Sequence, residues 1–201
     1  MTINTKDMLN SILSSISRID YVKPDDIPNI DLYIDQVTTF MEAQLKATKR
    51  FPEDKILTKT MINNYTKNNL LPPPVKKKYS KEHVLLLIFI YYFKNILSIK
   101  DIETLLEPIT ETYFHKNEDF DLTSIYEEVC QLEKSRIDTV QKDIARMYKN
   151  AGETFSEVPD SEKEDLQLFS FICSLSFDVY VKKQLIEKLI DDLPDTKPKK
   201  D

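Results

Sequence analysis

The sequence predicts an all-α fold, and three observations support this prediction. Gly152 is the only glycine among 201 residues, so few positions suit a tight β-turn or a glycine loop that cradles phosphate. Apolar residues recur three and four positions apart over several long stretches, which is the spacing of amphipathic helices. Hydrophobic residues make up 41% of the chain and charged residues 31%, a balance that is ordinary for a globular protein and argues against wholesale disorder.

The predicted helices follow one another through short polar or proline-containing connections. With their boundaries, they are Thr5–Ile19, Asp31–Thr48, Lys59–Asn68, Lys81–Leu97, Ile99–Leu106, Leu122–Ala151 and Glu162–Asp191. Thr58, Ser80 and Ser98 have the chemistry of N-caps for three of these helices. Pro108 is expected to end the helix that begins at Ile99, because proline lacks the backbone N–H that a helix interior needs.

The apolar pattern also predicts which segments are buried. Val84–Phe93 is apolar on every side, so we expect a helix that is covered all round; its ten residues fall short of the about 20 that span a membrane. The aromatic-rich stretch Leu166–Val181 is expected to be buried, and Cys130 and Cys173 are expected to be buried free thiols. The first residues lack the apolar segment of a signal peptide, so we expect a cytoplasmic protein without membrane contact.

We expect three parts along the chain. Residues 1–110 are predicted to form a helical domain that contains the candidate functional region at about 56–106. Residues 111–193 are predicted to form a helical dimerisation or effector region whose long helices make a bundle; this region either packs on the first domain or forms a separate one. Residues 194–201 are charged and contain proline, and we expect a disordered tail there.

One segment departs from the acidic character of the chain. Between Lys55 and Glu82 there are seven lysines and one acidic residue, a local charge of +6, whereas the whole chain carries −6 and the remainder therefore −12. A protein that concentrates its cations in this way is expected to present one face to a polyanion.

On a helical wheel, the short helix after Thr58 divides into an apolar and a polar face. Met61, Ile62 and Tyr65 lie on the apolar face, which we expect to pack against the core. The polar face carries five residues that can contact phosphates or base edges: Lys59, Thr60, Asn63, Asn64 and Lys67. Asn can bond adenine bidentately in the major groove and Lys can bond phosphate or guanine, so the polyanion that fits this face is duplex DNA.

A basic segment follows this helix directly. The three prolines Pro72–Pro74 are expected to stop the helix and to hold Lys76, Lys77 and Lys78 in an extended arm. Such an arm can follow a phosphate backbone and release counterions. Tyr79 is expected to pack beneath the arm or to hydrogen-bond a phosphate.

The segment Met61–Pro72 reads MINNYTKNNLLP, and Tyr79–Val84 and Leu97–Ile102 each read as the serine-capped start of a helix. In this order the segments resemble the region of MerR-type regulators that runs from the recognition helix through the wing to the next two helices. The resemblance covers about 50 residues, Ile56–Leu105, and Asn69 stands where those regulators usually have glycine. The chain as a whole resembles the uncharacterised bacterial domain-of-unknown-function family 1836.

The MerR resemblance implies a winged helix-turn-helix core with a short wing, and a transcription regulator that binds duplex DNA. The DNA-binding residues that follow from the wheel, the basic segment and the resemblance are Lys59, Thr60, Asn63, Asn64, Lys67, Lys76, Lys77, Lys78 and Tyr79. Helix-turn-helix proteins usually bind two half-sites as dimers, so we expect a homodimer. No effector-binding motif follows the wing, which leaves a small-molecule effector unassigned.

Other chemistry has little support in the sequence. His83 and His115 have no cysteine or carboxylate at metal-ligand spacing, and neither has a serine or cysteine partner for nucleophilic catalysis. We therefore expect no catalytic residue, metal or cofactor. Two other interpretations stay open: an all-α protein–protein interaction module whose lysine-rich patch binds an acidic partner, and a ligand-sensing helical bundle without DNA contact.

Overall fold

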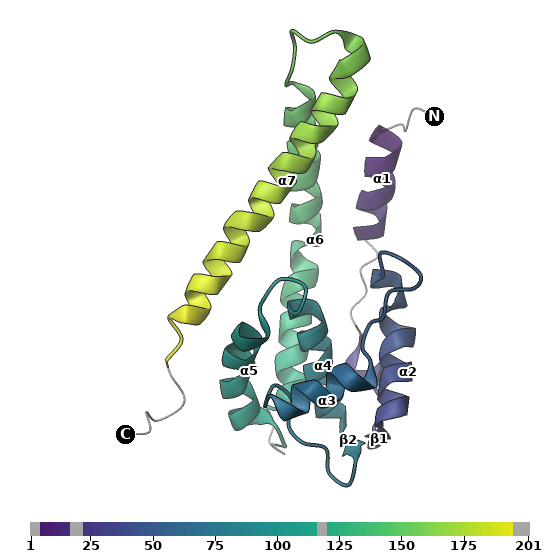
Figure 1. Ribbon diagram of the computed structural model, residues 1–201, viewed down its shortest axis with the longest axis vertical. Helices are drawn as coiled ribbons and strands as arrows, with labels where there is room; N and C mark the ends of the chain where they lie inside the picture. Colours follow the sequence, from purple (N-terminus) through teal and green to yellow (C-terminus); the bar gives the residue numbers. More distant parts are fainter. Residues whose placement is uncertain (1–4, 17–21, 116–119, 195–201) are drawn as a thin grey trace. The chain divides into compact units, whose positions relative to one another are not determined.

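The structure of the protein is a computed structural model that describes residues 5–16, 22–115 and 120–194 (Figure 1). Its helices and strands, in chain order, are α1 Thr5–Ile16, β1 Leu32–Tyr33, α2 Ile34–Leu45, α3 Lys59–Lys67, β2 Lys78–Tyr79, α4 Lys81–Phe93, α5 Ile99–Tyr113, α6 Leu122–Gly152 and α7 Asp160–Asp191, with 3₁₀ turns at Pro24–Asp26 and Lys46–Thr48. The prediction of a mainly helical fold is confirmed. The end of the predicted Thr5–Ile19 helix and residues 195–201 of the predicted tail lie outside the described residues.

The chain divides into two compact units. One comprises Met1–Tyr21 and Cys130–Leu185, and the other comprises Val22–Val129 and Ile186–Asp201. Because α6 and α7 cross these boundaries, each of the two helices contributes residues to both units.

The core of the 22–129 unit is α4. Its buried residues are His83, Val84, Leu85, Leu86, Leu87, Ile88, Ile90 and Tyr91, so the prediction of a helix that is covered all round is confirmed. A helix without a polar face must be surrounded by other segments. No helix within the described ranges is long and apolar enough to cross a membrane.

Segments from both ends of the 22–129 unit cover α4. The ring of Tyr126 at the start of α6 meets Phe89 edge to face, with 5.4 Å between centroids. Tyr126 Oη also donates a hydrogen bond to the Val22 carbonyl at 2.8 Å. On another side, the Thr48 and Tyr91 hydroxyls are hydrogen-bonded to each other. These contacts join the beginning and the end of the unit through its central helix.

A two-stranded antiparallel sheet joins the segment before α2 to the segment after α3. Leu32 pairs with Tyr79, and Tyr33 pairs with Lys78. The sequence does not predict this sheet, and the helix expected from Asp31 begins at Ile34 instead. The reason is that Leu32 and Tyr33 pair with β2 in extended conformation, and Leu32 becomes buried.

The helix that begins at Ile99 continues past Pro108 to Tyr113, so the prediction that Pro108 ends it is wrong. A proline inside a helix removes one backbone hydrogen bond. Thr110 Oγ1 donates to the Leu106 carbonyl at 2.7 Å in the same turn. Directly after the helix, the Phe114 ring packs edge to face on His83, with 4.8 Å between centroids. This tertiary contact anchors the C-terminal end of α5 despite the proline.

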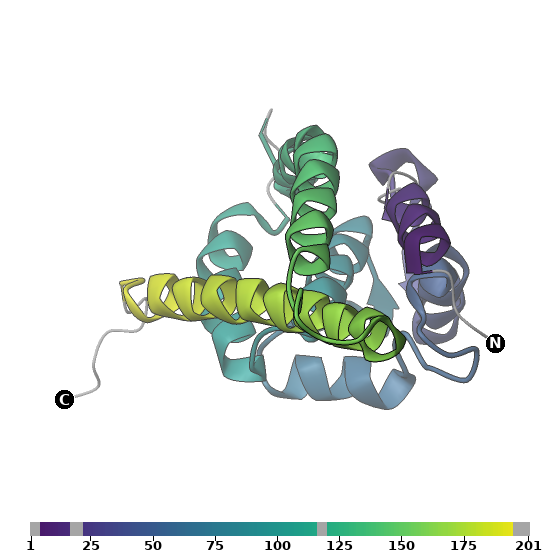
Figure 2. The same cartoon turned by 90° about the horizontal axis from the view of Figure 1, so that it is seen from above.

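The other unit has a small apolar core that is shared by α1, α6 and α7. Leu9, Ala151 and Phe171 are buried together. The rings of Tyr148 and Phe171 meet edge to face, with 5.3 Å between centroids. Figures 1 and 2 show α7 turning back past the C-terminal end of α6, where these contacts lie.

Much of the middle of α7 is exposed, so the prediction that Leu166–Val181 is buried is wrong. Phe171 is 8% exposed, whereas Phe169 and Phe177 are 61% and 67% exposed. The reason is that the core of this unit contacts one side of α7 only. Cys173 is exposed and Cys130 is partly buried, which also corrects the expectation of two buried thiols.

His83 lies at the N-terminus of α4 and is a buried polar residue of the 22–129 unit. Its Nδ1 accepts a hydrogen bond from the Ser80 backbone N–H at 3.0 Å, so the imidazole takes the part that Glu or Gln plays in a capping box. The side chain is 1% exposed, and its Nε2 has no hydrogen-bond partner among the described residues. Burial, and to a lesser extent the nearby His115, lower the pKa of His83 to about 4.

We predict that His83 makes the protein less stable in mild acid. The unfolded chain takes up a proton at His83 below its ordinary pKa of 6.5, whereas the folded chain does so only near pH 4. The free energy of unfolding therefore falls as the pH drops through this window, by about 2 kcal/mol between pH 7 and pH 5. Urea unfolding at a series of pH values measures this loss.

His83→Gln is the matched variant for this prediction, because its side-chain oxygen can still accept the Ser80 N–H bond but does not titrate. We expect the variant to lose most of the pH dependence between pH 7 and pH 5. If the variant and the natural chain lose the same stability over this range, His83 is not the responsible group.

Candidate nucleic-acid interface

The nine-residue helix α3 is held by one buried face and one cap. Thr58 Oγ1 accepts a hydrogen bond from the Met61 backbone N–H at 3.1 Å, as the sequence predicts for an N-cap. Ile62 and Tyr65 are buried, and burial raises the pKa of the Tyr65 hydroxyl. The five residues of the predicted polar face are all exposed: Lys59, Thr60, Asn63, Asn64 and Lys67. The helix therefore presents this face to solvent.

The C-terminus of α3 is closed by a left-handed residue. Asn69 has φ 57°, a conformation that Asn tolerates better than most residues do. The Leu70 N–H donates to the Tyr65 carbonyl at 2.9 Å, and the Asn69 N–H donates to the Thr66 carbonyl at 3.3 Å. This pair of bonds is the Schellman motif. It reverses the chain abruptly and buries Leu70 and Leu71, so the basic segment begins close to the helix.

The lysines after the prolines form a tight turn, so the prediction of an extended arm is wrong for Lys76 and Lys77. Their φ angles are 50° and 64°. The Lys78 N–H donates to the Val75 carbonyl at 3.0 Å, and these two residues form an antiparallel bridge. Two central residues with positive φ are the signature of a two-residue hairpin turn of type I′. The chain here forms a hairpin turn closed by Val75 and Lys78.

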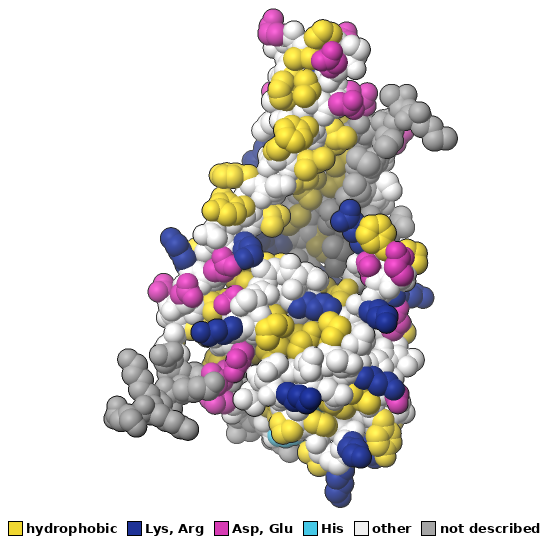
Figure 3. Space-filling view, in the orientation of Figure 1, with side chains coloured by type: hydrophobic (Ala, Val, Ile, Leu, Met, Phe, Trp, Pro, Cys, Tyr) yellow, Lys and Arg dark blue, Asp and Glu magenta, His cyan; other side chains and the backbone are white. Residues whose placement is uncertain are grey.

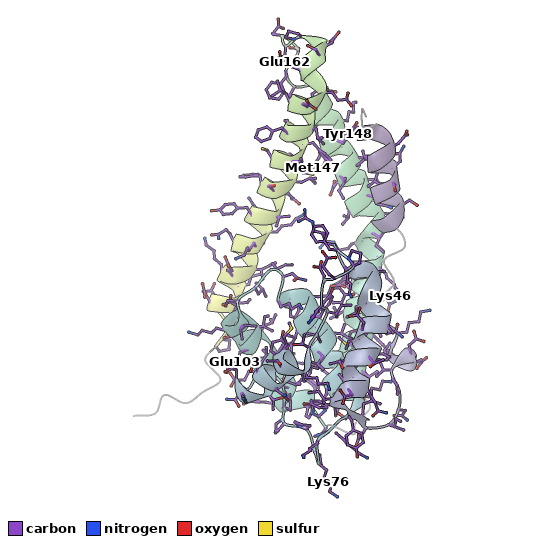
Figure 4. All side chains as sticks on the ribbon, turned by 45° about the vertical axis from the view of Figure 1, so that its right-hand side comes forward. Lys46, Lys76, Glu103, Met147, Tyr148 and Glu162 are labelled. Carbon is purple, nitrogen blue, oxygen red and sulfur yellow. The ribbon has the colours of Figure 1, made fainter. Side chains whose placement is uncertain are left out.

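Both central lysines of this turn are exposed. In Figure 4 the labelled Lys76 lies at the tip of the turn and points away from the helices. Figure 3 shows Lys and Arg side chains over the part of the surface formed by α3 and the turn, with apolar and uncharged groups between them. The turn thus carries two cations on a short, fixed projection.

Lys78 and Tyr79 belong to β2 and have different surroundings from the two turn lysines. Lys78 Nζ lies 5.3 Å from the centroid of the Tyr33 ring, a cation–π contact. Tyr79 is 3% exposed and packs against His83. Burial raises the pKa of Tyr79, and a hydrogen bond with Thr66 partly opposes this shift. Of the two roles expected for Tyr79, packing beneath the basic segment is the one that its position provides.

A hollow joins α3 to the turn. It has a volume of about 330 Å³ and is lined by Ile34, Lys59, Asn63, Pro74, Lys77 and Tyr79. Lys59 and Asn63 come from the exposed face of α3, and Lys77 comes from the turn. The structure therefore brings residues of the predicted helix face and of the predicted basic segment to one concave surface. Thr60, Asn64, Lys67, Lys76 and Lys78 do not line this hollow.

Asp35 belongs to the same surface and is not among the residues that the sequence predicts for the site. Its carboxylate forms an ion pair with Lys59 Nζ, and both side chains are more than half exposed. Asp35 lies in the first turn of α2, where a carboxylate is favoured by the helix dipole. That position gives no hint of a partner 24 residues along the chain, so only the tertiary structure reveals the pair. The positive charge of Lys59, one of the five candidate residues on α3, is thus partly neutralised.

Among the described residues, no group of three or more His, Cys, Asp or Glu side chains could hold a metal ion. His115 Nδ1 lies 2.8 Å from Glu82 Oε2, and His83 belongs to the cap of α4. Apart from the Asp35 carboxylate, the surface around α3 offers ammonium groups, carboxamides and hydroxyls. Such groups bind phosphates and the hydrogen-bonding edges of bases.

Comparison with known proteins gives one result that bears on this region. The sequence profile of a family described as a domain of unknown function, DUF1836, matches residues 22–129. No curated protein and no solved structure matches the chain. The matched residues make up more than half of the chain and coincide with the main segment of the compact unit that contains α3 and the turn. The chain belongs to the DUF1836 family.

Proposed function

We propose that this protein is a DNA-binding transcription regulator of MerR-like type, which binds duplex DNA as a homodimer. In this proposal α3 contacts the major groove, and the turn at Lys76 and Lys77 contacts the phosphate backbone. A protein that acts on chromosomal DNA would be cytoplasmic. The proposal assigns no catalytic residue, metal or cofactor.

The observation that carries the proposal is the hollow shared by α3 and the turn. Lys59 and Asn63 on the helix and Lys77 on the turn line one open concavity, beside further exposed polar residues of α3. A helix in the major groove needs an exposed polar face and a neighbouring cationic group that fixes its register on the phosphates. The buried positions Ile62 and Tyr65 hold the opposite face of α3, so the exposed face is presented in one orientation.

The chain order around this surface also supports a MerR-like type. A short strand precedes the helix α2, the exposed helix α3 follows, and the turn leads into a strand that pairs back with the first. Because of this pairing, the basic turn lies beside Ile34 of α2 and beside Lys59 and Asn63 of α3. A winged helix-turn-helix requires the same neighbourhood of recognition helix and wing.

Fluorescence anisotropy with a labelled random-sequence duplex at low salt tests the proposal. We expect binding at micromolar protein, with affinity that falls steeply as salt rises, because cations that neutralise phosphates release counterions. Absence of binding under these conditions would contradict the proposal and favour the interpretation that the lysine-rich surface binds an acidic protein.

The turn provides a variant that separates charge from stability. Lys at a position with positive φ is strained, whereas Asn and Gly suit a type I′ turn. Lys76→Asn combined with Lys77→Gly is therefore expected to raise the free energy of unfolding by about 1 kcal/mol or more. The same variant is expected to weaken DNA binding at every sequence. The slope of log affinity against log salt should decrease by about 0.9 for each phosphate that the variant no longer neutralises.

Chemical unfolding and anisotropy titrations on this double variant measure the two effects. Because the variant is expected to be more stable than the natural chain, weaker binding cannot be ascribed to unfolding. An unchanged salt slope would exclude the turn from the interface.

Asn63 is expected to discriminate between bases. Its carboxamide can form two hydrogen bonds with adenine, so Asn63→Ala should relax the preference at one or two base pairs by about 1–3 kcal/mol per base pair. Selection of binding sites from a random library measures this preference. Asn29→Ala removes another exposed carboxamide from the same unit and serves as control. If Asn63→Ala weakens DNA binding equally at all sequences, Asn63 does not discriminate between bases and only positions the protein on the duplex.

Asp35 is expected to restrain DNA binding. Asp35→Asn removes a negative charge from the interface and frees the Lys59 ammonium from its ion pair. We expect affinity for duplex DNA to rise about two- to fivefold, the scale of an exposed ion pair. The salt slope should become steeper by up to about 0.9, because Lys59 can then neutralise a phosphate. Glu53→Gln, which removes an exposed acid elsewhere in the unit, is the control. If both variants gain the same affinity for DNA, the gain comes from the change in net charge and not from the release of Lys59.

A further inference from the structure

The hollow between α3 and the basic turn is lined by two kinds of side chain. Its volume of about 330 Å³ falls in the range of small-molecule sites, which are mostly apolar and carry a few placed polar groups. Figure 3 shows apolar groups between the Lys side chains on this part of the surface. The lining divides into an apolar set, Ile34, Pro74 and Tyr79, and a polar set, Lys59, Asn63 and Lys77. The hollow therefore has the composition of a site for a small molecule.

The apolar part of the lining is fixed before any ligand arrives. Tyr79 is buried and pairs with Leu32 in the two-stranded sheet. Ile34 opens α2, and the ring of Pro74 restricts its own backbone; both side chains are half-buried. An apolar group that enters this hollow loses contact with water, and the chain does not need to reorder to receive it.

The two ammonium groups reach the hollow from different elements. Lys59 is the first residue of α3, and Lys77 is the second central residue of the left-handed turn, with φ 64°. Asn63, one helical turn after Lys59, adds a carboxamide that can donate to an anion. Ammonium groups form charge-assisted hydrogen bonds with carboxylate and phosphate oxygens. The cations thus lie beside the apolar lining, an arrangement that suits an anion with an apolar body.

The charges at the hollow favour an anion with a single negative charge. The Asp35 carboxylate pairs with Lys59, so the two ammonium groups that line the hollow and this one carboxylate leave a net charge of +1. A monoanion balances this charge. A dianion, such as a phosphate monoester, would bring a second negative charge close to Asp35, which is unfavourable. A carboxylate therefore matches the hollow better than a phosphate does.

We propose that this hollow binds a small organic monocarboxylate with an apolar body, and that the bound acid excludes DNA from the same surface. The carboxylate group contacts Lys59 and Lys77, and the body packs against Ile34, Pro74 and Tyr79. The site would let a small acid release the protein from DNA. The binding step needs no DNA, whereas the exclusion step rests on the proposed function.

Backbone amide chemical shifts of the labelled full chain, measured during addition of 3-phenylpropionate without DNA, test the binding step. We expect half-saturation at about 1 mM, the scale for a ligand of this size in an open site, with the largest shifts in residues 34–35, 59–63 and 77–79. Two further probes separate the parts of the ligand, since acetate has the charge without the ring and 3-phenylpropan-1-ol has the ring without the charge. Each should bind at least about tenfold more weakly, because each lacks one of the two contacts.

Lys77→Asn tests the site without disturbing the turn, because Asn tolerates the left-handed conformation. The loss of the ammonium group should weaken 3-phenylpropionate binding about two- to fivefold. Asp35→Asn, which frees Lys59 from its ion pair, should strengthen it by a similar factor. Lys55→Gln is the control, since Lys55 is exposed in the same unit and does not line the hollow. If Lys77→Asn and Lys55→Gln have equal effects, the ligand does not contact the turn and the proposed site is rejected.

Anisotropy of a labelled duplex tests the exclusion step. The titration is repeated with 3-phenylpropionate at ten times its measured dissociation constant, and with acetate at the same ionic strength. Competition for one surface predicts that the apparent dissociation constant for DNA rises about elevenfold with 3-phenylpropionate. Acetate should produce only the effect of the added salt.

Three results would overturn the proposal. If 3-phenylpropionate binds no tighter than acetate, the apolar lining makes no contact with the ligand. Chemical shift changes confined to other parts of the chain would place the ligand outside the hollow. DNA affinity that is the same in 3-phenylpropionate and in acetate would reject the exclusion. A chain that binds 3-phenylpropionate in the hollow but binds no DNA would keep the carboxylate site and reject the proposed function, so the two failures are distinguishable.

Discussion

The 22–129 unit depends on one constraint: α4 has no polar face. Val84 through Ile88 are fully buried, so every side of this helix must be covered by other segments. Tyr126 of α6, Thr48 after α2 and Phe114 after α5 contact it from different directions. The need to bury α4 brings the neighbouring segments together around it. It also determines which faces of the neighbouring helices turn inward.

The candidate DNA-binding surface is a consequence of this arrangement. Tyr79, next to the N-terminus of α4, is buried beside His83, so the turn before it is anchored directly to the core. On α3, Ile62 and Tyr65 are buried, so Lys59 and Asn63 on the opposite side of the helix face solvent. The exposed residues are thereby held by rigid neighbours, and the surface needs little reorganisation to meet a duplex. A preorganised surface loses less conformational entropy on binding.

Residue spacing predicts the parts of the structure that depend on local pattern. The two faces of α3, the caps at Thr58 and Ser98 and the covered helix α4 follow from helical periodicity and capping chemistry. The ion pair between Asp35 and Lys59 could not be predicted, because it joins residues that only the tertiary fold brings together. The left-handed turn at Lys76 and Lys77 could not be predicted either, since such turns usually signal themselves through Asn or Gly. The exposure of α7 could not be predicted either, because hydrophobicity alone does not show which apolar residues of a helix face the core.

The proposed DNA-binding surface is tested most directly by the change of backbone amide chemical shifts when a short duplex is added to the labelled full chain. We predict that the largest changes fall on residues 58–68 and 75–79, with smaller changes at Ile34 and Asp35 beside them. Changes that avoid these residues, or no change at duplex concentrations that exceed the protein, would contradict the claim that α3 and the basic turn form a DNA-binding surface.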